Sequence, residues 1–400
     1  MTLQKKAGSI EPILDYDVKH LVKFHAAQNI PLSYDEAYRL GWQAVLSING
    51  DELSRIQSTS LLTALHNQAT YSWTNRGYIP GHDHYVPQNA AEQVAGVCAA
   101  IFNKDISQSE KRFVEPNVPF AVDNCGMGGD IVVTANVSTI SAILASGLGV
   151  PMCKHGSPSN TDKGRHGSSD FISNILGFDT YLPKHKVEEG VEQVNFGYTE
   201  ALNVAFKGVH LQTHKFAMMP HMNDIIGPIT NPLSPRIHSR KIIGVNHLMT
   251  PRIIAEAYKI MNDRGVTAME HFIGVRGFID SEKQYGVDEI SICSGGTLVS
   301  ELCNGKITDY HLHAADFGLD ELTAEQVSPP DDMSKGEFSR QLLFNTIDHP
   351  AIDMIFANTA MVLYVAQGTP LKDGVKQVRN AYYNGTLQKH VHRILNFYKQ

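Results

Sequence analysis

The chain of 400 residues has few cysteines, no long apolar run and no basic excess. Its cysteines are Cys98, Cys125, Cys153, Cys293 and Cys303. An odd number of cysteines without a C-x-x-C pair is typical of a reduced, cytoplasmic chain. Residues 1–11 lack the apolar core of a signal peptide. Because no apolar run approaches the roughly 18 residues of a membrane span, we expect no membrane partner.

The charge balance gives no overall basic footprint for nucleic acid. There are 34 basic and 41 acidic residues, a net charge of −7, and the pI is about 6.2. Nucleic acid is therefore not expected as the main partner. Hydrophobic residues make up 42% and charged residues 19% of the chain, as in ordinary globular proteins. The length is sufficient for two domains.

Two familiar nucleotide-binding motifs are missing from the most glycine-rich turn, Gly126–Asp130. This turn lacks the G-x-G-x-x-G spacing of a dinucleotide site, and no G-K-[ST] follows as in a P-loop. The apolar run 118–122 before it predicts a buried strand, and the small-residue run 140–148 after it predicts a helix. The segment therefore predicts a strand, a glycine turn and a helix of another kind.

The residues around this turn indicate phosphate binding. Glycines let backbone N–H groups approach an anion closely. Ser138 and Thr139 fall where the helix would begin, so hydroxyls and free N–H groups converge there. Lys154 follows on the next strand, and Gly167-Ser168 forms a second small turn. Two phosphate cradles one βαβ unit apart suit a ligand with phosphates at both ends.

The rest of the chain predicts helices in its N-terminal part and alternating strands and helices further on. Ser33 is a suitable helix N-cap, with Glu36 three residues on as in a capping box. Gly, Pro and aromatic residues predict an ordered loop over 71–89, which contains His82 and His84. An H-x-H pair can bind metal, but a lid or surface loop is the simpler interpretation. Later, strands at 241–245 and 270–275 flank a helix at 251–263, which predicts a parallel sheet covered on both faces.

In their order, these elements resemble the anthranilate phosphoribosyltransferase family. The matching stretches are G-M-G-G-D at 126–130, T-x-N-x-S-T at 134–139, K-H-G at 154–156, G-S-x-D at 167–170, I-G-P-I-T-N-P at 226–232 and G-x-D-E-I-S at 286–291. The D-F-G-L at 316–319 also matches and is interpreted as structural, because no kinase motif surrounds it. The resemblance runs along most of the chain, and the 71–89 loop is an insertion relative to it.

The resemblance implies an α/β fold with a mainly parallel central sheet, of the nucleoside phosphorylase and phosphoribosyltransferase type, plus a small helical domain. The helical domain would span 1–110, with 195–225 packing onto it, and the donor-binding α/β domain would span 111–400. The family's usual state implies a homodimer through the helical domain. The function of the 71–89 loop does not follow from the sequence.

The resemblance also implies that the ligand is 5-phosphoribosyl 1-pyrophosphate (PRPP), with Mg²⁺ as cofactor. The implied PRPP-binding residues are Gly126, Gly128, Gly129, Asp130, Thr134, Asn136, Ser138, Thr139, Lys154, Gly167 and Ser168. The implied Mg²⁺ site is Ser138, Asp288 and Glu289, since Mg²⁺ prefers oxygen ligands. No covalent catalytic residue is expected, because holding and neutralising the leaving pyrophosphate is an electrostatic and metal-assisted task.

The acceptor half departs from the family pattern. After K-H-G the family has Asn-Arg, whereas this chain has Ser157-Pro158. The arginine that binds the anthranilate carboxylate in the family is His214 here, and a histidine or lysine does not reproduce its bidentate fork. Our candidate acceptor residues are His155, Gly156, Ser157, His210, His214, Lys215 and Gly227. The acceptor is therefore expected to be anthranilate or another aromatic or nitrogen-containing molecule.

Two other functions fit parts of the pattern. A nucleoside phosphorylase of the same fold would need a nucleoside site in place of a diphosphate site, and the Asp288-Glu289 pair argues against it. A nucleic-acid-binding relative without transferase activity would need a basic groove, which the acidic pI disfavours. Phosphoribosyl transfer to the nitrogen of an aromatic amine is the function that we expect.

Overall fold

A computed structural model gives the arrangement of most of the chain. It describes residues 30–49, 52–74, 89–108, 113–128, 130, 132–159, 167–214, 223–246, 249–283 and 286–399. Within these ranges, no helix is by itself long and apolar enough to cross a membrane; one sharply bent helix pair, 351–367 with 371–383, passes such a test only when the two are joined.

One mainly parallel sheet organises the molecule, in the order β3-β2-β1-β4-β5-β7-β8, with β6 paired to β5. Its strands are β1 (Phe120–Gly126), β2 (Met152–Gly156), β3 (Phe196–Glu200), β4 (His238–Gly244), β5 (Met269–Phe278), β6 (Gly286–Val287), β7 (Thr297–Cys303) and β8 (Lys306–Leu312). The pairings from β3 to β5 are parallel, and those that involve β6, β7 and β8 are antiparallel. The fold class expected from the sequence is confirmed.

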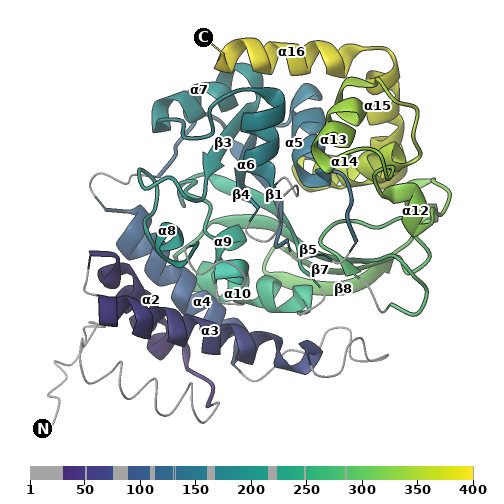
Figure 1. Cartoon of the computed structure of the whole chain (residues 1–400). Helices are drawn as coiled ribbons and strands as arrows, with labels where there is room; N and C mark the ends of the chain where they lie inside the picture. Colours follow the sequence, from purple (N-terminus) through teal and green to yellow (C-terminus); the bar gives the residue numbers. More distant parts are fainter. Residues whose placement is uncertain are drawn as a thin grey trace, which may run out of the picture.

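Helices cover both faces of the sheet (Figure 1). Helices α5 (Val137–Gly147) and α14 (Ala351–Gln367) pack on one face, and α10 (Pro251–Asp263) packs on the other beside α4 (Ala90–Ile101). Neighbouring side chains of a strand point to opposite faces. Ile242 of β4 accordingly joins the core under α5 and α14, while Ile243 joins the core under α10.

This arrangement creates a switch point between β1 and β4. From β1 the chain passes through α5 to β2 on one side, whereas from β4 it passes through α10 to β5 on the other side. The connections after β1 and β4 therefore leave the sheet toward opposite faces and open a crevice at the carboxyl ends of these strands. Open α/β sheets bind their ligands at such a point.

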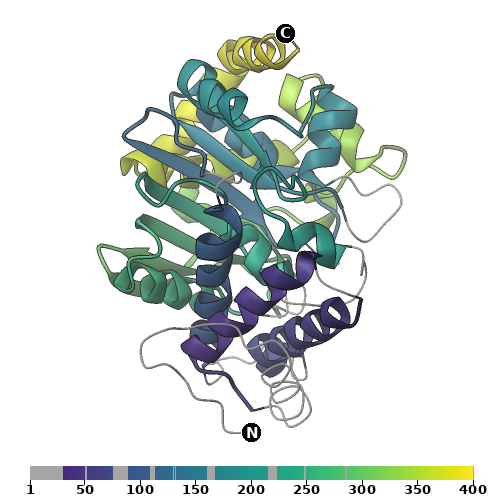
Figure 2. The same ribbon diagram turned by 90° about the vertical axis from the view of Figure 1, so that its left-hand side faces the viewer.

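The N-terminal helices form a separate group at one end of the molecule, and the C-terminal helices lie at the opposite end (Figures 1 and 2). The first group holds α2 (Tyr34–Leu46), α3 (Glu52–Thr74) and α4. Ser33 caps α2 in the predicted capping box with Glu36. Helices α8 (Val209–His214) and α9 (Asn223–Ile229) lie between this group and the sheet.

The structure differs from several smaller expectations. Helix α3 continues to Thr74, into the stretch that we expected to be a loop, and residues 75–88 lie outside the described residues. The segment 195–225 begins with β3, which belongs to the sheet. The division of the chain into domains 1–110 and 111–400 stays a prediction. Antiparallel β7 and β8 did not stand out in the sequence.

The remaining helices complete the described structure. They are α6 (Ser168–Asp170), α7 (Lys184–Val194), α11 (Ala314–Phe317), α12 (Ala324–Val327), α13 (Lys335–Phe344), α15 (Leu371–Tyr383) and α16 (Thr386–Tyr398), with short 3-10 or π segments η2 (Ser47–Asn49), η3 (Phe102–Ile106) and η4 (Phe171–Leu176). Asp316 of the D-F-G-L stretch accepts a hydrogen bond from the His313 N–H, in agreement with a structural role.

Close packing of α2 on α4 gives a stability prediction. A Cβ added at Gly96 would clash with the Tyr34 carbonyl and lie 2.9 Å from Ala37 Cβ. Helix propensity alone favours Ala over Gly by about 1 kcal/mol, but overpacking costs about 1–3 kcal/mol. We expect Gly96→Ala to lower the free energy of unfolding in urea. Glu92→Ala on the same helix is the control, and a more stable Gly96→Ala would contradict the packing argument.

Candidate active site

The carboxyl ends of β1 and β4 converge on the loop after β6. Gly126 ends β1, and a Cβ there would clash with the Asp288 carboxylate. Gly244 ends β4, and a Cβ there would clash with the Asp288 main chain. Glycine at both strand ends is therefore needed for Asp288 to reach the crevice at the switch point.

Three carboxylates meet in this crevice. One oxygen each of Asp130, Asp288 and Glu289 lies within 4.8 Å of the other two. The Asp288 N–H donates to Asp130 at 3.1 Å, the Gly128 N–H donates to the Asp288 carboxylate at 2.5 Å, and Thr134 Oγ1 donates to Glu289 at 3.1 Å. The glycine-rich turn and the Asp-Glu pair, 160 residues apart in sequence, thus form one site.

The carboxylates repel one another in a buried setting. Burial, followed by the charge of Asp288, raises the pKa of Glu289 to about 8. Burial, Asp288 and Glu289 together raise the pKa of Asp130 well above its usual range. Ionising all three carboxylates in this buried cluster is unfavourable without a counter-charge. A divalent cation would supply that charge and favour the ionised carboxylates. Asp130, Asp288 and Glu289 are the side chains that could hold it.

Residues predicted for the first phosphate cradle lie at the N-terminal end of α5. Lys154 is fully buried, donates to the Asn124 carbonyl at 2.6 Å and lies 3.4 Å from Ser138 Oγ. Burial lowers its pKa. Asn136 Nδ2 and Thr139 Oγ1 are buried and have no hydrogen-bond partner among the residues that the structure describes. Since buried polar atoms are normally paired, these two atoms fit an anionic ligand that would pair them.

The second predicted cradle lies at the end of β2. A Cβ at Gly156 would clash with Ser168 Oγ, so the two residues are in close contact. Asp170 closes the turn by accepting from the Gly167 N–H at 2.9 Å and the Ser159 N–H at 2.8 Å. Gly167 and Ser168 therefore lie beside Gly156, and the donor and acceptor halves of the predicted site are neighbours here.

The predicted acceptor residues gather around a basic cluster. His155 is 1% exposed and lies 2.7 Å, Nε2 to Nζ, from Lys207, which is fully buried. Burial and the charge of Lys207 lower the pKa of His155 well below its usual value. His210 lies against Gly227, where a Cβ would be 3.0 Å from its Nε2. His155, His210 and Gly227 are thus brought together.

Some predicted residues remain without a structural account. Gly129 and Lys215 lie outside the described residues, as do the side chain of His214 and residues 160–166, which follow Ser157 in the chain. Ser138 is at the edge of the phosphate cradle, and its part in a metal site stays a prediction. The roles of all the predicted site residues are proposals.

The sequence did not predict the positions of two residues of the site, Asp130 and Lys207. Asp130 belongs with the acidic pair, although the sequence placed it only with the donor phosphates. A carboxylate directly after a glycine turn was the available signal. Lys207 stands in an ordinary Phe-Lys-Gly stretch, where nothing marks it as buried.

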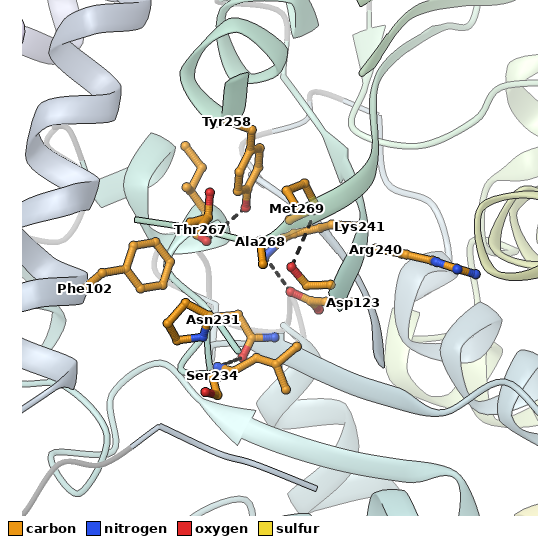
Figure 3. A pocket seen from close by; sticks show the side chains of 14 residues that line it. Phe102, Asp123, Asn231, Ser234, Arg240, Lys241, Tyr258, Thr267, Ala268 and Met269 are labelled. Atoms are coloured by element: carbon orange, nitrogen blue, oxygen red, sulfur yellow. Dashed lines mark hydrogen bonds and ion pairs between the residues drawn. The ribbon is translucent and has the colours of Figure 1, made fainter. Parts of the chain in front are cut away.

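A small cavity lies between the sheet and the helical group, near the middle of β4 (Figure 3). Its volume is about 30 Å³, and Phe102, Tyr258 and the ion pair of Asp123 with Lys241 line it. Since a cavity needs about 10–15 Å³ by this measure to hold one water molecule, this one has room for water but not for a substrate.

Comparison with known proteins agrees with this geometry. Residues 119–388 match the model of the glycosyl transferase family, a/b domain. The anthranilate phosphoribosyltransferase of Chlorobium phaeobacteroides is 31% identical over 307 residues, 76% of this chain and 82% of the relative. That of Caldivirga maquilingensis is 31% identical over 361 residues, 88% and 90% of the two chains.

Solved structures show the same fold. Anthranilate phosphoribosyltransferase from Thermus thermophilus has a TM-score of 0.70 at 21% identity, covering 96% of this chain and 99% of that one. The enzyme from Saccharomyces cerevisiae, in complex with PRPP and Mg, has a TM-score of 0.70 at 22% identity, covering 96% and 98%.

The fold and the crevice at its switch point define a glycosyltransferase of the α/β type. Within that class, the chain belongs to the anthranilate phosphoribosyltransferase family. The resemblance on which the sequence analysis relied is confirmed.

Lys207 gives a prediction for the pH dependence of stability. Burial, with a contribution from Lys241, lowers its pKa from 10.5 to about 7. Between these values the unfolded chain binds more protons than the folded chain, so the free energy of unfolding rises with pH. The other groups acting on Lys207 are Asp105, Cys98 and Cys125.

We therefore expect the difference in unfolding free energy, wild type minus Lys207→Met, to increase from pH 7 to pH 10. The limit is about 1.4 kcal/mol per pH unit, measured by urea unfolding. Lys376→Met, at a side chain 74% exposed, controls for the loss of one positive charge. A difference that stays flat or falls over this range would contradict the prediction.

Proposed function

We propose that the protein transfers the 5-phosphoribosyl group of PRPP to the nitrogen of an aromatic amine, anthranilate or a related acceptor, with loss of pyrophosphate. Membership of the family supports the PRPP-dependent transfer. The observation that carries the proposal is a three-carboxylate cluster at the switch point of the sheet, near the N-terminal end of α5 and the buried Lys154.

In this reaction the bond from ribose C1 to the pyrophosphate oxygen breaks, and a bond from C1 to the acceptor nitrogen forms. Negative charge builds on the leaving group, so the protein has to hold and stabilise it. The glycine turn, the N-terminal end of α5 and Lys154 are the groups that we assign to its phosphates. Asn136 Nδ2 and Thr139 Oγ1, which are buried and unpaired within the described part of the chain, support this assignment.

We assign Asp130, Asp288 and Glu289 to Mg²⁺ binding, with Ser138 as a further ligand expected from the family resemblance. When bound, Mg²⁺ would neutralise charge on the pyrophosphate. The raised pKa of Glu289 supports the assignment, because the burial of ionised carboxylates without a cation is unfavourable. Gly128 holds Asp288 in place through its N–H group.

We place the acceptor beside the end of β2 and the turn after α9. The predicted acceptor residues His155 and His210 lie there around the buried Lys207, which supports this placement. His214 is the position of the family's carboxylate-binding arginine, and its replacement supports an acceptor pocket that differs from the family's. A homodimer through the helical group is a further expectation from the family.

The reaction can be tested by pyrophosphate release from PRPP and Mg²⁺, first with anthranilate and then with other aromatic amines and nitrogen heterocycles. We expect release with at least one acidic aromatic amine. A protein that does not bind PRPP would contradict the proposal and would favour the nucleic-acid-binding alternative. Phosphate-dependent cleavage of a nucleoside would instead favour the phosphorylase alternative.

The metal assignment predicts the effect of neutralising the acidic pair. Asp288→Asn with Glu289→Gln should lower pyrophosphate release at least about 100-fold, as losses of electrostatic stabilisation do. Mg²⁺ should also raise the melting temperature of the wild type but not of this variant. Asp331→Asn with Asp332→Asn, an exposed adjacent pair, is the matched control. An equal rise in melting temperature with Mg²⁺ in both variants would contradict the assignment.

The acceptor assignment predicts a gain of function. If His214 occupies the position of the carboxylate clamp, His214→Arg should raise kcat/KM for anthranilate about tenfold or more, because a bidentate charged hydrogen bond contributes about 1.5–3 kcal/mol. Leu211→Arg, at an exposed position of the same helix, adds the same charge elsewhere. A similar gain in both variants, or in neither, would contradict the position of the clamp.

A further inference from the structure

Lys207 makes three hydrogen bonds in a fully buried position. Its Nζ donates to the Thr230 carbonyl at 2.8 Å and to Thr230 Oγ1 at 3.0 Å, and it lies 2.7 Å from His155 Nε2. A lysine ammonium has three N–H donors and no acceptor. In the ammonium form, which predominates below its pKa of about 7, the three partners match its three donors, and His155 Nε2 has to accept.

The second ring nitrogen of His155 is also occupied. His155 Nδ1 lies 2.9 Å from the Thr199 carbonyl and 2.9 Å from Thr199 Oγ1. A carbonyl oxygen only accepts hydrogen bonds, so Nδ1 carries the proton when Nε2 accepts from Lys207. His155 is thus a neutral imidazole whose two nitrogens both bind the protein.

Lys207 also completes a clamp on the end of α9. Three successive carbonyls, those of residues 228, 229 and 230, each accept a hydrogen bond from a buried side chain. The donors are Lys241 from β4, Tyr258 from α10 at 3.0 Å and Lys207 at 2.8 Å. The last carbonyls of a helix have no partner within the helix, and cations are favourable there. Of these three donors, Lys207 also binds the end of β2.

From these contacts we propose that Lys207 is a positioning residue for the acceptor: it fixes His155 as the Nδ1-protonated tautomer and sets the spacing between the end of β2 and the turn after α9. The inference rests on the proposed function, since it assigns the acceptor to this space. It also assigns His155 a role other than proton transfer. With both nitrogens bound to the protein, His155 neither removes a proton from the acceptor amine nor gives one to it.

The tautomer can be measured without any substrate. Long-range ¹H–¹⁵N NMR spectra of histidine-labelled protein distinguish Nδ1–H, Nε2–H and cationic imidazoles, and His155→Gln identifies the signal among the 19 histidines. In the wild type at pH 6.5 we expect an Nδ1–H imidazole at His155. An Nε2–H or cationic signal at His155 would overturn the proposal, and this test does not require Lys207→Met to fold.

The variant Lys207→Met tests the positioning role. It keeps most of the length of the unbranched side chain and removes all three donors. We expect the KM for the acceptor to rise at least tenfold, the KM for PRPP to change less than twofold, and the His155 signal to lose its single tautomer. Lys376→Met, at an exposed lysine, should leave all three unchanged.

Two results would overturn the positioning role: equal rises in both KM values, or an unchanged acceptor KM with an unchanged His155 spectrum. A failure of the proposed function looks different. It would appear as wild-type protein without pyrophosphate release for any acceptor, while the substrate-free spectrum still showed the Nδ1–H tautomer.

Discussion

The ion pair between Asp123 and Lys241 at the centre of the sheet fixes the positions of β1 and β4 relative to the end of β2 and the end of α9. Lys241 Nζ lies 2.6 Å from Asp123 Oδ2, and both side chains are buried. Asp123 also accepts the His155 N–H at 2.8 Å, and Lys241 donates to the Pro228 carbonyl. Burial lowers the pKa of Lys241, but the Asp123 carboxylate more than offsets this and raises the pKa above its ordinary value. Loss of either partner would leave a buried, uncompensated charge, which is strongly destabilising.

Around this ion pair the charges are separated across the strand ends. Three carboxylates collect where β1 and β4 end, and Lys207, His155 and His210 collect beside β2 and the turn after α9. The acidic side suits a divalent cation, and the other side holds the residues that we assign to the acceptor. Such a separation gives each of the two proposed substrates its own part of the site, and a transfer between two bound substrates depends on their relative orientation.

Much of the donor side could be predicted from the sequence because its residues lie close together in the chain. Residues 126–139 carry the glycine turn and the start of α5, and the structure brings them together with Lys154. The acceptor side is made from single residues of separate segments. Lys207 meets both His155 and Thr230 only because the turn before α8 and the turn after α9 fold against β2. No local pattern marks such a contact.

The sequence by itself determined the elements whose signals are local: the capping box at Ser33, the helix 251–263, the glycine turn and the acidic pair at 288–289. These depend on hydrogen bonds and side-chain spacing within a few residues. Only the tertiary structure decided that Asp130 joins that pair, that Lys207 is buried, and that both nitrogens of His155 bind the protein. These properties arise from burial and from partners that lie 23 to 158 residues away in the chain. Burial lowers the local dielectric, and together with the hydrogen-bond partners it sets the charge of each group.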